Sequence, residues 1–438
     1  MILRHDPAVF TLSLVLGFLS ITVQASEANS GRVFYVRQTI GNDTNDGLSP
    51  QTAWRSLSRL GSDVHAGDVA YVGPGLYREM VTVANSGTPD AMIQFIADTT
   101  GQHTGDPPGT VMITGADTMN ETAFVPQPSP GVFMAPGLKR QLLQVVEMDA
   151  AKYLYRIATD TPEYIRENLP ALEVVARMPS TFHHNRESGK LYIHTSDGRA
   201  PSSHEIELIR RSYGFLILEK HYVSVTGFTF RHMGTAGIGF GQGSGHGLAL
   251  NNTSYGSWQG IRISESNHVR VEGNTVFRNG NSGIYFLSGS TQGHASRNIA
   301  YENAIGVRWS SGSVNGVALE NLVFENREAG IAIEDTDNIR VSNNLIANNG
   351  ITQLLLRKSE YTLMTNCYGS GGTEQLIATT GFREHFETLD DFQQATGQDL
   401  DASENCSPLP QEIDVNRLHI ETRIYAERAR KILSAQVE

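Results

Sequence analysis

The sequence predicts an all-β fold: a single-stranded right-handed parallel β-helix (solenoid) with an inserted lobe and a C-terminal helical cap. Three residue series share one period, and repeats of roughly 20–50 residues indicate coils that bury their apolar faces against their neighbours. One asparagine recurs every 22 to 24 residues, at Asn252, Asn274, Asn298, Asn321, Asn344 and Asn366. A second lies five residues behind four of these, at Asn279, Asn303, Asn326 and Asn349. A glycine followed by Ile or Val keeps the same spacing, at Gly237, Gly260, Gly283, Gly306 and Gly330.

Each repeat contains three segments with the alternating pattern of short strands. In one repeat these segments are residues 269–271, 275–277 and 283–286. Stacked coils would place equivalent segments in parallel, about 4.8 Å apart. A leucine-rich repeat is the main alternative, but the repeats lack a leucine-rich convex helix and carry a second, glycine-led strand instead.

The periodic asparagines are expected at the bends between strands. Asparagine tolerates the left-handed dihedral angles of a bend, and its amide both donates and accepts hydrogen bonds. Six asparagines in register therefore predict a stack in which each amide satisfies its own buried groups and those of the bend backbone.

The composition fits a body of strands and bends rather than surface helices. The 438 residues include 43 glycines, and only 18% of the residues are charged. Lysine is rare and the formal net charge is −12. Because phosphate binding needs a basic face, we expect no nucleic-acid partner.

The N-terminus predicts export. Arg4 and His5 precede an apolar run from Ala8 to Val23, and small residues up to Ala25 offer a cleavage site. We interpret residues 1–25 as a signal peptide, with an uncleaved anchor as the alternative. The protein is therefore expected to be secreted, or to reside in the periplasm or cell envelope.

The repeats divide the rest of the chain into four regions. The first coils occupy residues 31–117, an insertion lobe 118–212, the main repeats 213–372, and a cap with a tail 373–438. The lobe starts with a proline-rich stretch that breaks the repeat. Insertions in solenoids form loops on one face, where they commonly wall a cleft.

Local patterns refine the lobe and the C-terminal region. Residues 185–190 predict a hairpin, and Thr388 to Gly397 read as a capped helix. Residues 417–431 predict a polar surface helix. The two cysteines, Cys367 and Cys406, either pair or remain as buried thiols.

The first coils carry short motifs in a fixed order: Gly67-Asp68, Pro74-Gly-Leu-Tyr77, Gly87-Thr-Pro89, Ile93-Gln-Phe95 and Ile113-Thr-Gly115. This order resembles the first coils of chondroitinase-B and alginate-lyase-like polysaccharide lyases, within the secreted pectin-lyase-like β-helix superfamily. Several β-helix glycoside hydrolases share it, and residues 395–399 are similar to the segment that closes many bacterial enzymes of this kind. The resemblance implies a polysaccharide as the partner. Those lyases use a Lys/Arg pair beside a carboxylate-bound calcium; this pair does not map onto the chain, so no catalytic residue is carried over.

An oxygen-rich loop at residues 42–46 is a candidate Ca²⁺ site. It lacks the EF-hand spacing, so an ordinary turn is the preferred interpretation. Ca²⁺ is the one cofactor that the sequence suggests.

Aligning the coils on the glycine-led strand places Arg262, Tyr285 and Arg308 at outward positions of three consecutive coils. We call these residues the Arg–Tyr–Arg row and predict them as the catalytic residues. Guanidinium groups pair with carboxylates or sulfates, and tyrosine can stack on a sugar or exchange a proton. The row therefore suits an acidic polymer lying along the solenoid; a solvated charged face is the alternative.

A second group lies on the following coils. Glu334, Asp335, Arg357 and Lys358 are predicted to contact substrate. A hydrolase needs two carboxylates, but the coils next to Glu334 offer serines on one side and basic residues on the other. Glu334 is therefore expected to pair with Arg308 or Arg357.

Other aromatic and histidine residues are weaker candidates. Trp258 is a potential sugar platform, whereas Trp309 falls on the inward register and is expected in the core. The histidines near bends lack the spacing of a metal site and are expected to be ordinary surface or bend residues: His232, His246, His268 and His294.

Taken together, these features predict a polysaccharide-degrading enzyme. A lyase that cleaves an acidic, uronate-containing glycan by β-elimination is favoured. The alternatives are a β-helix glycoside hydrolase and a non-catalytic glycan-binding or cell-surface structural protein.

Overall fold

The computed structural model describes residues 31–119, 124–148, 152–158, 161–369, 375–379 and 384–404. The predicted signal peptide (1–25) and the predicted helix at 417–431 lie outside the described residues. None of the helices within the described ranges is long and apolar enough to span a membrane.

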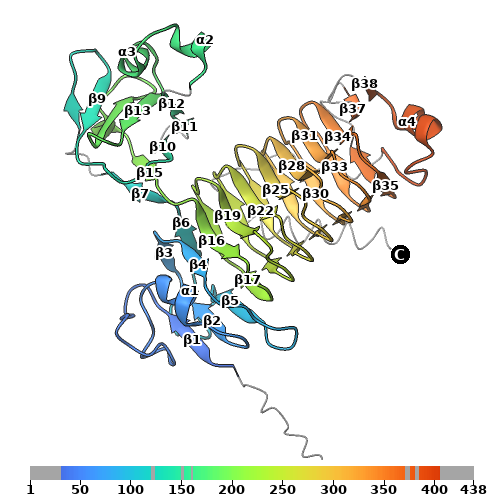
Figure 1. Cartoon of the computed structure of the whole chain (residues 1–438), viewed down its shortest axis with the longest axis horizontal. Coiled ribbons are helices and arrows are strands. Elements are labelled where there is room, and N and C mark those ends of the chain that lie inside the picture. Colours follow the sequence, from blue (N-terminus) through green and yellow to red (C-terminus); the bar gives the residue numbers. More distant parts are fainter. Residues whose placement is uncertain are drawn as a thin grey trace, which may run out of the picture. The chain divides into compact units, whose positions relative to one another are not determined.

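Three long sheets form the body, and all their strands are parallel except β38 (Figure 1). Sheet 1 consists of β1 (Val33–Val36), β2 (Val69–Val72), β5 (Ile93–Ala97), β17 (Val223–Thr226), β20 (Leu248–Leu250), β23 (Arg270–Glu272), β26 (His294–Ser296), β29 (Val317–Leu319), β32 (Ile339–Ser342) and β35 (Tyr361–Met364). Sheet 2 consists of β3 (Gly75–Tyr77), β6 (Val111–Thr114), β18 (Thr229–Arg231), β21 (Thr253–Tyr255), β24 (Thr275–Phe277), β27 (Ile299–Tyr301), β30 (Leu322–Phe324), β33 (Leu345–Ala347) and β36 (Cys367–Gly369). Sheet 3 consists of β4 (Val81–Val83), β16 (Tyr213–Leu218), β19 (Ala236–Gly241), β22 (Gln259–Ser264), β25 (Ser282–Leu287), β28 (Ile305–Ser310), β31 (Ala329–Glu334), β34 (Thr352–Arg357), β37 (Gln375–Thr379) and β38 (Glu384–Phe386).

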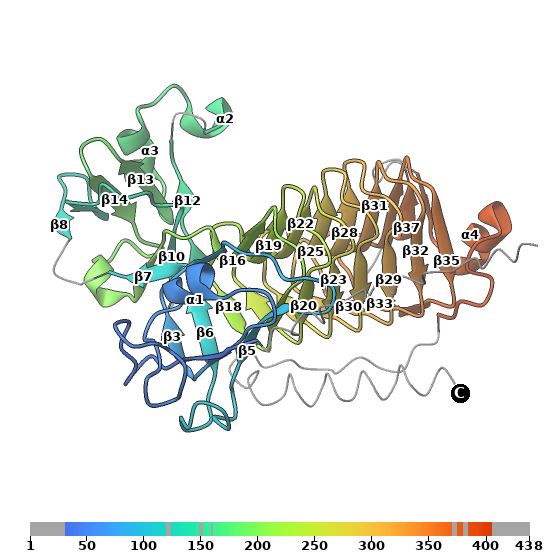
Figure 2. The same cartoon turned by 60° about the horizontal axis from the view of Figure 1, so that its bottom comes forward.

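Each coil passes through sheets 1, 2 and 3 in turn, as β23, β24 and β25 show. We call the turn from sheet 1 to sheet 2 the first bend, the turn from sheet 2 to sheet 3 the second bend, and the return to sheet 1 the third bend. The sequence placed these strands to within about a residue, because alternation is the direct signature of a half-buried strand. Figure 2 shows the same stack of coils from another side.

The insertion interrupts one coil without breaking the sheets. Strands β4, β5 and β6 precede the lobe, yet they pair in parallel with β16, β17 and β18, which follow it. The ring of Phe95 packs 5.1 Å from that of Phe215 across this junction. Helix α1 (Ser58–Asp63) lies within the first coils. The coils on either side of the lobe therefore share one continuous core.

The lobe is a small two-sheet unit. One sheet contains β7 (Ala116–Thr118), β10 (Gln144–Glu147), β11 (Lys152–Tyr153) and β15 (Ile206–Ile209). The other contains β8 (Val125–Pro126), β9 (Val132–Ala135), β12 (Tyr155–Arg156), β13 (Thr181–Asn185) and β14 (Lys190–His194). Helices α2 (Glu163–Arg166) and α3 (Ala171–Arg177) and the short 3-10 helix η2 (Pro201–Ser203) complete it. The predicted hairpin is present, with Asn185 paired to Lys190, and antiparallel pairing of β7 with β15 closes the lobe at its base.

The solenoid core consists of stacked apolar side chains at equivalent positions of successive coils. Along sheet 3 the innermost stack is Phe215, Ile238, Ile261, Ile284, Val307, Ile331, Leu354 and Ile377, all buried. Trp309 is also internal, as predicted, and its ring stacks on Phe286 with centroids 4.9 Å apart. Identical spacing of the coils lets like side chains pack on like, which is how a solenoid buries apolar area without a compact globule.

The six asparagines of the first series form the predicted hydrogen-bonded ladder, and the second series forms another. In the first bend the backbone N–H and the side-chain amide of Asn274 both donate to Oδ1 of Asn298, at 2.9 and 3.0 Å. Asn298 repeats these contacts with Asn321, and its amide also donates to the carbonyl of Val271 at 2.8 Å. The second bend carries the same device from Asn279 to Asn349. Each buried amide is thereby satisfied by the coils on either side.

The ladder asparagines are not the left-handed residues of their bends, which corrects the sequence-based expectation. Positive φ occurs one residue earlier, at Asn251, Arg297, Glu320, Asn343 and Thr365 before the first ladder and at Arg278, Glu302, Glu325 and Asn348 before the second. The position before each asparagine therefore accepts several residue types. The asparagine itself is selected for its amide, since its side chain must reach inward while the preceding side chain points outward.

The C-terminal cap continues the first ladder. Helix α4 (Leu389–Thr396) has Thr388 as its N-cap and left-handed Gly397 as its C-cap, as predicted. Beyond it, Asp399 accepts the backbone N–H and the side-chain amide of Asn366 at 3.2 and 2.9 Å, in the place of a further asparagine. Cys367 is disulfide-bonded, and the only other cysteine, Cys406, lies outside the described residues.

Candidate functional site

The Arg–Tyr–Arg row lies in register on sheet 3. Arg262 on β22 pairs with Tyr285 on β25, which pairs with Arg308 on β28. Neighbouring parallel strands are about 4.8 Å apart, so the three side chains leave adjacent coils on one face. The structure thus brings together all three residues that the sequence predicted.

The three side chains of the row differ in their contacts with neighbouring residues. The Arg262 guanidinium donates to the amide oxygen of Gln259 at 3.2 Å. The Tyr285 side chain is 9% exposed, and its hydroxyl is 2.8 Å from the hydroxyl of Ser310. The Arg308 guanidinium carbon lies 4.9 Å from the centre of the Tyr285 ring. Arg308 therefore shields the tyrosine, and Arg262 is held by a neutral acceptor that leaves its charge uncompensated.

The acidic group beyond the row forms the ion pairs expected from the sequence. Glu334 is 5% exposed and contacts Arg308 at 2.6 Å and Arg357 at 3.4 Å. Arg357 also contacts Asp335 at 2.9 Å. Asp335 and Lys358 occupy left-handed third-bend positions, with φ of 52° and 47°, and both are exposed. Of the four predicted substrate contacts, Glu334 is the most buried, and it forms ion pairs with both Arg308 and Arg357.

A cavity of about 580 Å³ lies at the second bend, between the lobe and the coils. We call it the lobe cavity. Its lobe wall includes Leu143, Gln144 and Tyr153, and its solenoid wall includes Trp258, Arg278, Gly280, Glu302 and Arg327. Its volume falls within the range of about 300–1,000 Å³ that is typical of small-molecule sites. Sequence reasoning named Trp258 but could not place it beside the lobe.

Two carboxylates that the sequence analysis missed occupy adjacent coils at the second bend. The backbone N–H of Glu302 donates to the carbonyl of Glu325 at 3.1 Å, so the two residues hold equivalent positions. Glu302 also receives the Arg278 guanidinium at 2.5 Å. Partial burial and the adjacent Glu302 carboxylate raise the pKa of Glu325. The signal was present in the sequence, because both glutamates directly precede asparagines of the second series.

A buried charged cluster holds the lobe against this bend. Glu207 on β15 is fully buried and contacts Arg231 and His232, each at 2.8 Å. Burial opposes ionisation of Glu207, but the hydrogen bond from His232 and the charge of Arg231 bring its pKa below its usual value. His232 is therefore a bend residue, as expected, but it is buried and bonded to Glu207 rather than lying at the surface. Beside it, the Tyr153 hydroxyl donates to the carbonyl of Gly256 at 2.6 Å and joins the lobe to the bend.

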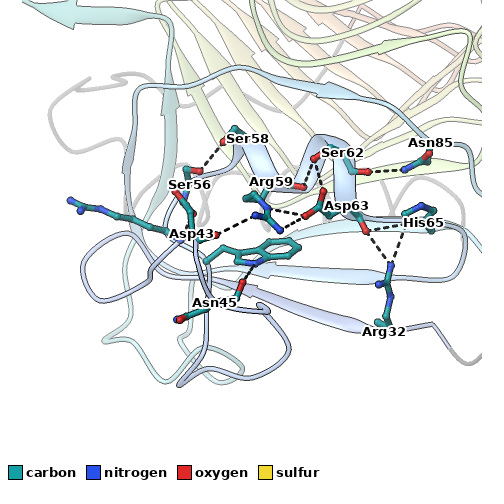
Figure 3. Close-up of polar contacts among 12 residues, drawn as sticks. Arg32, Asp43, Asn45, Ser56, Ser58, Arg59, Ser62, Asp63, His65 and Asn85 are labelled. Carbon is teal, nitrogen blue, oxygen red and sulfur yellow. Dashed lines mark hydrogen bonds and ion pairs between the residues drawn. The ribbon is translucent and has the colours of Figure 1, made fainter.

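The oxygen-rich loop at residues 42–46 uses its oxygens internally. Asp43 accepts the backbone N–H groups of Arg55 and Ser56 at 2.8 and 2.9 Å, and its carbonyl accepts the Arg59 guanidinium at 3.2 Å (Figure 3). Asp46 accepts the N–H of Leu48 at 3.0 Å. A Ca²⁺ ion needs six to eight oxygens directed at one point, and these carboxylates face donors instead. The loop geometry therefore favours the turn, and no reaction step is assigned to Ca²⁺ here.

One group in the lobe has the composition of a metal site. Ligand atoms of Glu147, Asp197 and His204 lie within 4.8 Å of one another. The two ring nitrogens of His204 are 3.0 and 3.1 Å from carboxylate oxygens of Glu147 and Asp197. Ser196 adds two hydrogen bonds to Glu147, at 2.8 and 3.0 Å. The ligand atoms are engaged with one another, so we assign no metal to them.

Comparisons with known proteins agree with this architecture. The family described as "Right handed beta helix region" matches residues 180–346. The match and the three parallel sheets together decide the fold. The protein is a right-handed parallel β-helix. A comparison with curated proteins gave no match.

Solved structures share this β-helix fold, among them the following two. A protein named XylC, solved in complex with xylose, has a TM-score of 0.59 and 16% identity, covering 79% of this chain and 68% of its own. A protein described as a glycoside hydrolase has a TM-score of 0.51 and 11% identity, covering 91% of this chain and 98% of its own. At these identities the likeness concerns the fold.

Proposed function

We propose that this β-helix protein acts on a polysaccharide and cleaves an acidic, uronate-containing glycan by β-elimination. The observation that carries the proposal is the in-register Arg–Tyr–Arg row on sheet 3. Its members lie on successive coils, so the row follows the direction in which a polymer along the solenoid would run. The xylose complex of the similarly folded XylC supports a sugar ligand.

The row supplies the groups that the elimination needs. The Arg262 guanidinium would pair with the uronate carboxylate, so that the proton on C5 becomes acidic enough to lose. Tyr285, as the phenolate, would accept that proton while the C5 electrons form the C4–C5 double bond and the C4–O bond breaks. The tyrosine would then return the proton to the departing oxygen. The Arg308 guanidinium lies over the Tyr285 ring, and its ion pair with Glu334 holds it in place.

Unsaturated ends absorb ultraviolet light, so incubation with a panel of uronate polymers tests the proposal directly. We expect product from the wild type, and a fall in kcat of about 10²-fold or more in Tyr285→Phe and Arg262→Ala, as for a lost proton-transfer or charge-stabilising group. Arg270→Ala is the matched control, because Arg270 is an exposed arginine on sheet 1. Assays with and without Ca²⁺ test the calcium prediction. Equal rates in all variants would remove the row from catalysis.

A glycoside hydrolase is the second candidate, favoured by Glu302 and Glu325 on adjacent coils. Retaining hydrolases place two carboxyl groups about 5–5.5 Å apart, close to one coil spacing. Glu325, whose pKa is raised, would be the acid, and Glu302 the nucleophile. Reducing ends that appear without unsaturated product, and that disappear in Glu302→Gln but not in Tyr285→Phe, would select this reaction over elimination.

A further inference from the structure

We propose that the lobe cavity is a second sugar-binding site, separate from the Arg–Tyr–Arg row, and that it binds an acidic sugar unit. The proposal takes its ligand class from the proposed function but concerns another part of the molecule. The cavity lies at the second bend, whereas the row lies on the outer face of sheet 3. A long glycan held at the cavity would be retained while another segment is cleaved.

Trp258 gives the cavity an aromatic platform. Its side chain is 53% exposed, although the other two tryptophans, Trp54 and Trp309, are each 1% exposed. The indole lies against Gly280, where an added Cβ would come within 2.9 Å of ring carbon Cε3. The glycine thus leaves room for the ring to rest on the next coil. An exposed, supported indole in a cavity suits the apolar C–H face of a sugar ring, and burial of an aromatic face contributes much of the energy of such sites.

The charges of the cavity favour an acidic sugar over a neutral one. Arg278 is paired with Glu302 at 2.5 Å. Arg327 instead donates to two backbone carbonyls, those of Gly280 at 3.0 Å and Glu302 at 3.2 Å. These acceptors are neutral, so they orient the guanidinium without cancelling its charge. The described lining residues therefore include two guanidinium groups and one carboxylate, which leaves an excess of positive charge.

The lobe wall is fixed before any ligand arrives. The Tyr153 hydroxyl donates to the carbonyl of Gly256, and a Cβ at Gly234 would lie 2.2 Å from Cδ1 of Leu143. These two contacts fasten the lobe at both a polar and an apolar point. A preformed wall lowers the ordering cost of binding, which is why the cavity can bind a short oligosaccharide on its own.

Trp258 makes the test specific, because the other tryptophans are buried. Acrylamide quenching of tryptophan fluorescence is measured with galacturonate trisaccharide, mannuronate trisaccharide and neutral xylotriose. We expect at least one uronate trisaccharide to protect the fluorescence, and to bind about tenfold more tightly than xylotriose through its charge-assisted contact. Absence of protection by all three, or equal binding of the acidic and neutral sugars, would overturn the proposal.

Calorimetry on variants locates the site independently of fluorescence. Trp258→Ala should weaken uronate binding by about tenfold or more, as expected for a central aromatic contact, and Trp258→Phe should recover part of it. Arg327→Ala should abolish the preference for the acidic sugar. Arg297→Ala is the matched control, because Arg297 holds the position before a ladder asparagine in the first bend, away from the cavity. Unchanged binding in Trp258→Ala would contradict the site.

The two proposals fail separately. Arg262→Ala and Tyr285→Phe should lose product but keep trisaccharide binding in the cavity. Binding without cleavage of any polymer would refute the proposed reaction and leave the cavity site standing. Cleavage that depends on the row, with no trisaccharide binding that depends on Trp258, would do the reverse.

Discussion

The first and second bends share one backbone arrangement but differ in what lies outside them. In both, a left-handed residue precedes an asparagine whose amide bonds to the next coil. Both also place charged side chains on the outside: Arg297 pairs with Glu272 and Glu320 at the first bend, and Arg278 with Glu302 at the second. The lobe stands opposite the second bend, where it forms one wall of the cavity. The repeat therefore supplies an array of outward positions, and the insertion decides which of them face a ligand.

The largest effect is expected where the two bends are alike. Asn298→Ala and Asn303→Ala should each destabilise the protein by about 3–5 kcal/mol, because two buried donors lose their acceptor and each costs about 1–3 kcal/mol. Asn298 accepts the backbone N–H and the side-chain amide of Asn274, and Asn303 does the same for Asn279. Denaturant unfolding measures both.

Asn315→Ala is the control for the ladder variants. Asn315 is an exposed third-bend asparagine that accepts a hydrogen bond from Asn338 at 2.7 Å. It should cost less than about 1 kcal/mol, as surface substitutions generally do. A clearly smaller loss in Asn303→Ala than in Asn298→Ala would show that the two ladders are not equivalent.

The next effect belongs to the second bend alone. Glu207→Gln removes the buried carboxylate that pairs with Arg231 and bonds to His232, and it should cost about 3 kcal/mol at neutral pH. The pKa of Glu207 is lower in the folded protein than its ordinary value of 4.5. Its contribution is therefore complete above that value and is lost as the pH falls through the folded-state pKa. The stability gap between wild type and variant should accordingly close below about pH 4.5.

Glu320→Gln, at the exposed first bend, provides the comparison for that pH series. Its gap to wild type should stay small at every pH, since Glu320 is only one of two partners of Arg297. A gap for Glu207→Gln that persisted unchanged in acid would mean that packing, rather than charge, holds the lobe.

The periodic part of the molecule could be read from sequence, for a physical reason. A coil packs only on its neighbours, so each structural requirement reappears after about one repeat. That is how the spacing gave the ladders, the inward position of Trp309 and the register of Arg262 with Tyr285. The repeat also predicts that Glu302 and Glu325 lie on adjacent coils, because their separation of 23 residues equals that of the asparagines that follow them.

The lobe cavity could not be found in this way. Tyr153 contacts Gly256 across a separation of 103 residues, and nothing in the lobe repeats. Which bend the lobe faces depends on the contacts of Glu207, Tyr153 and Leu143, whose partners carry no shared spacing. Similarly, the ion pair of Glu334 with Arg308 was expected from register, but the burial of Tyr285 beneath Arg308 was not, because burial depends on how the side chains fold over the face.

The smallest expected change in stability gives the most direct comparison of the first and second bends. Arg297 and Arg278 occupy the same position of their bends. Replacing either with alanine should lower the free energy of unfolding by only about 0.5 kcal/mol, since exposed ion pairs contribute about 0–1 kcal/mol and weaken with salt. Stability alone should therefore not distinguish the two variants, and thermal unfolding at low and high salt checks this.

Uronate binding should distinguish the two variants, because the Arg278 side chain lines the cavity and the Arg297 side chain does not. Equal loss of binding in both variants would indicate that charge acts over the whole surface. Loss confined to Arg278→Ala would show that the lobe turns one copy of a repeated structural pair into part of a binding site.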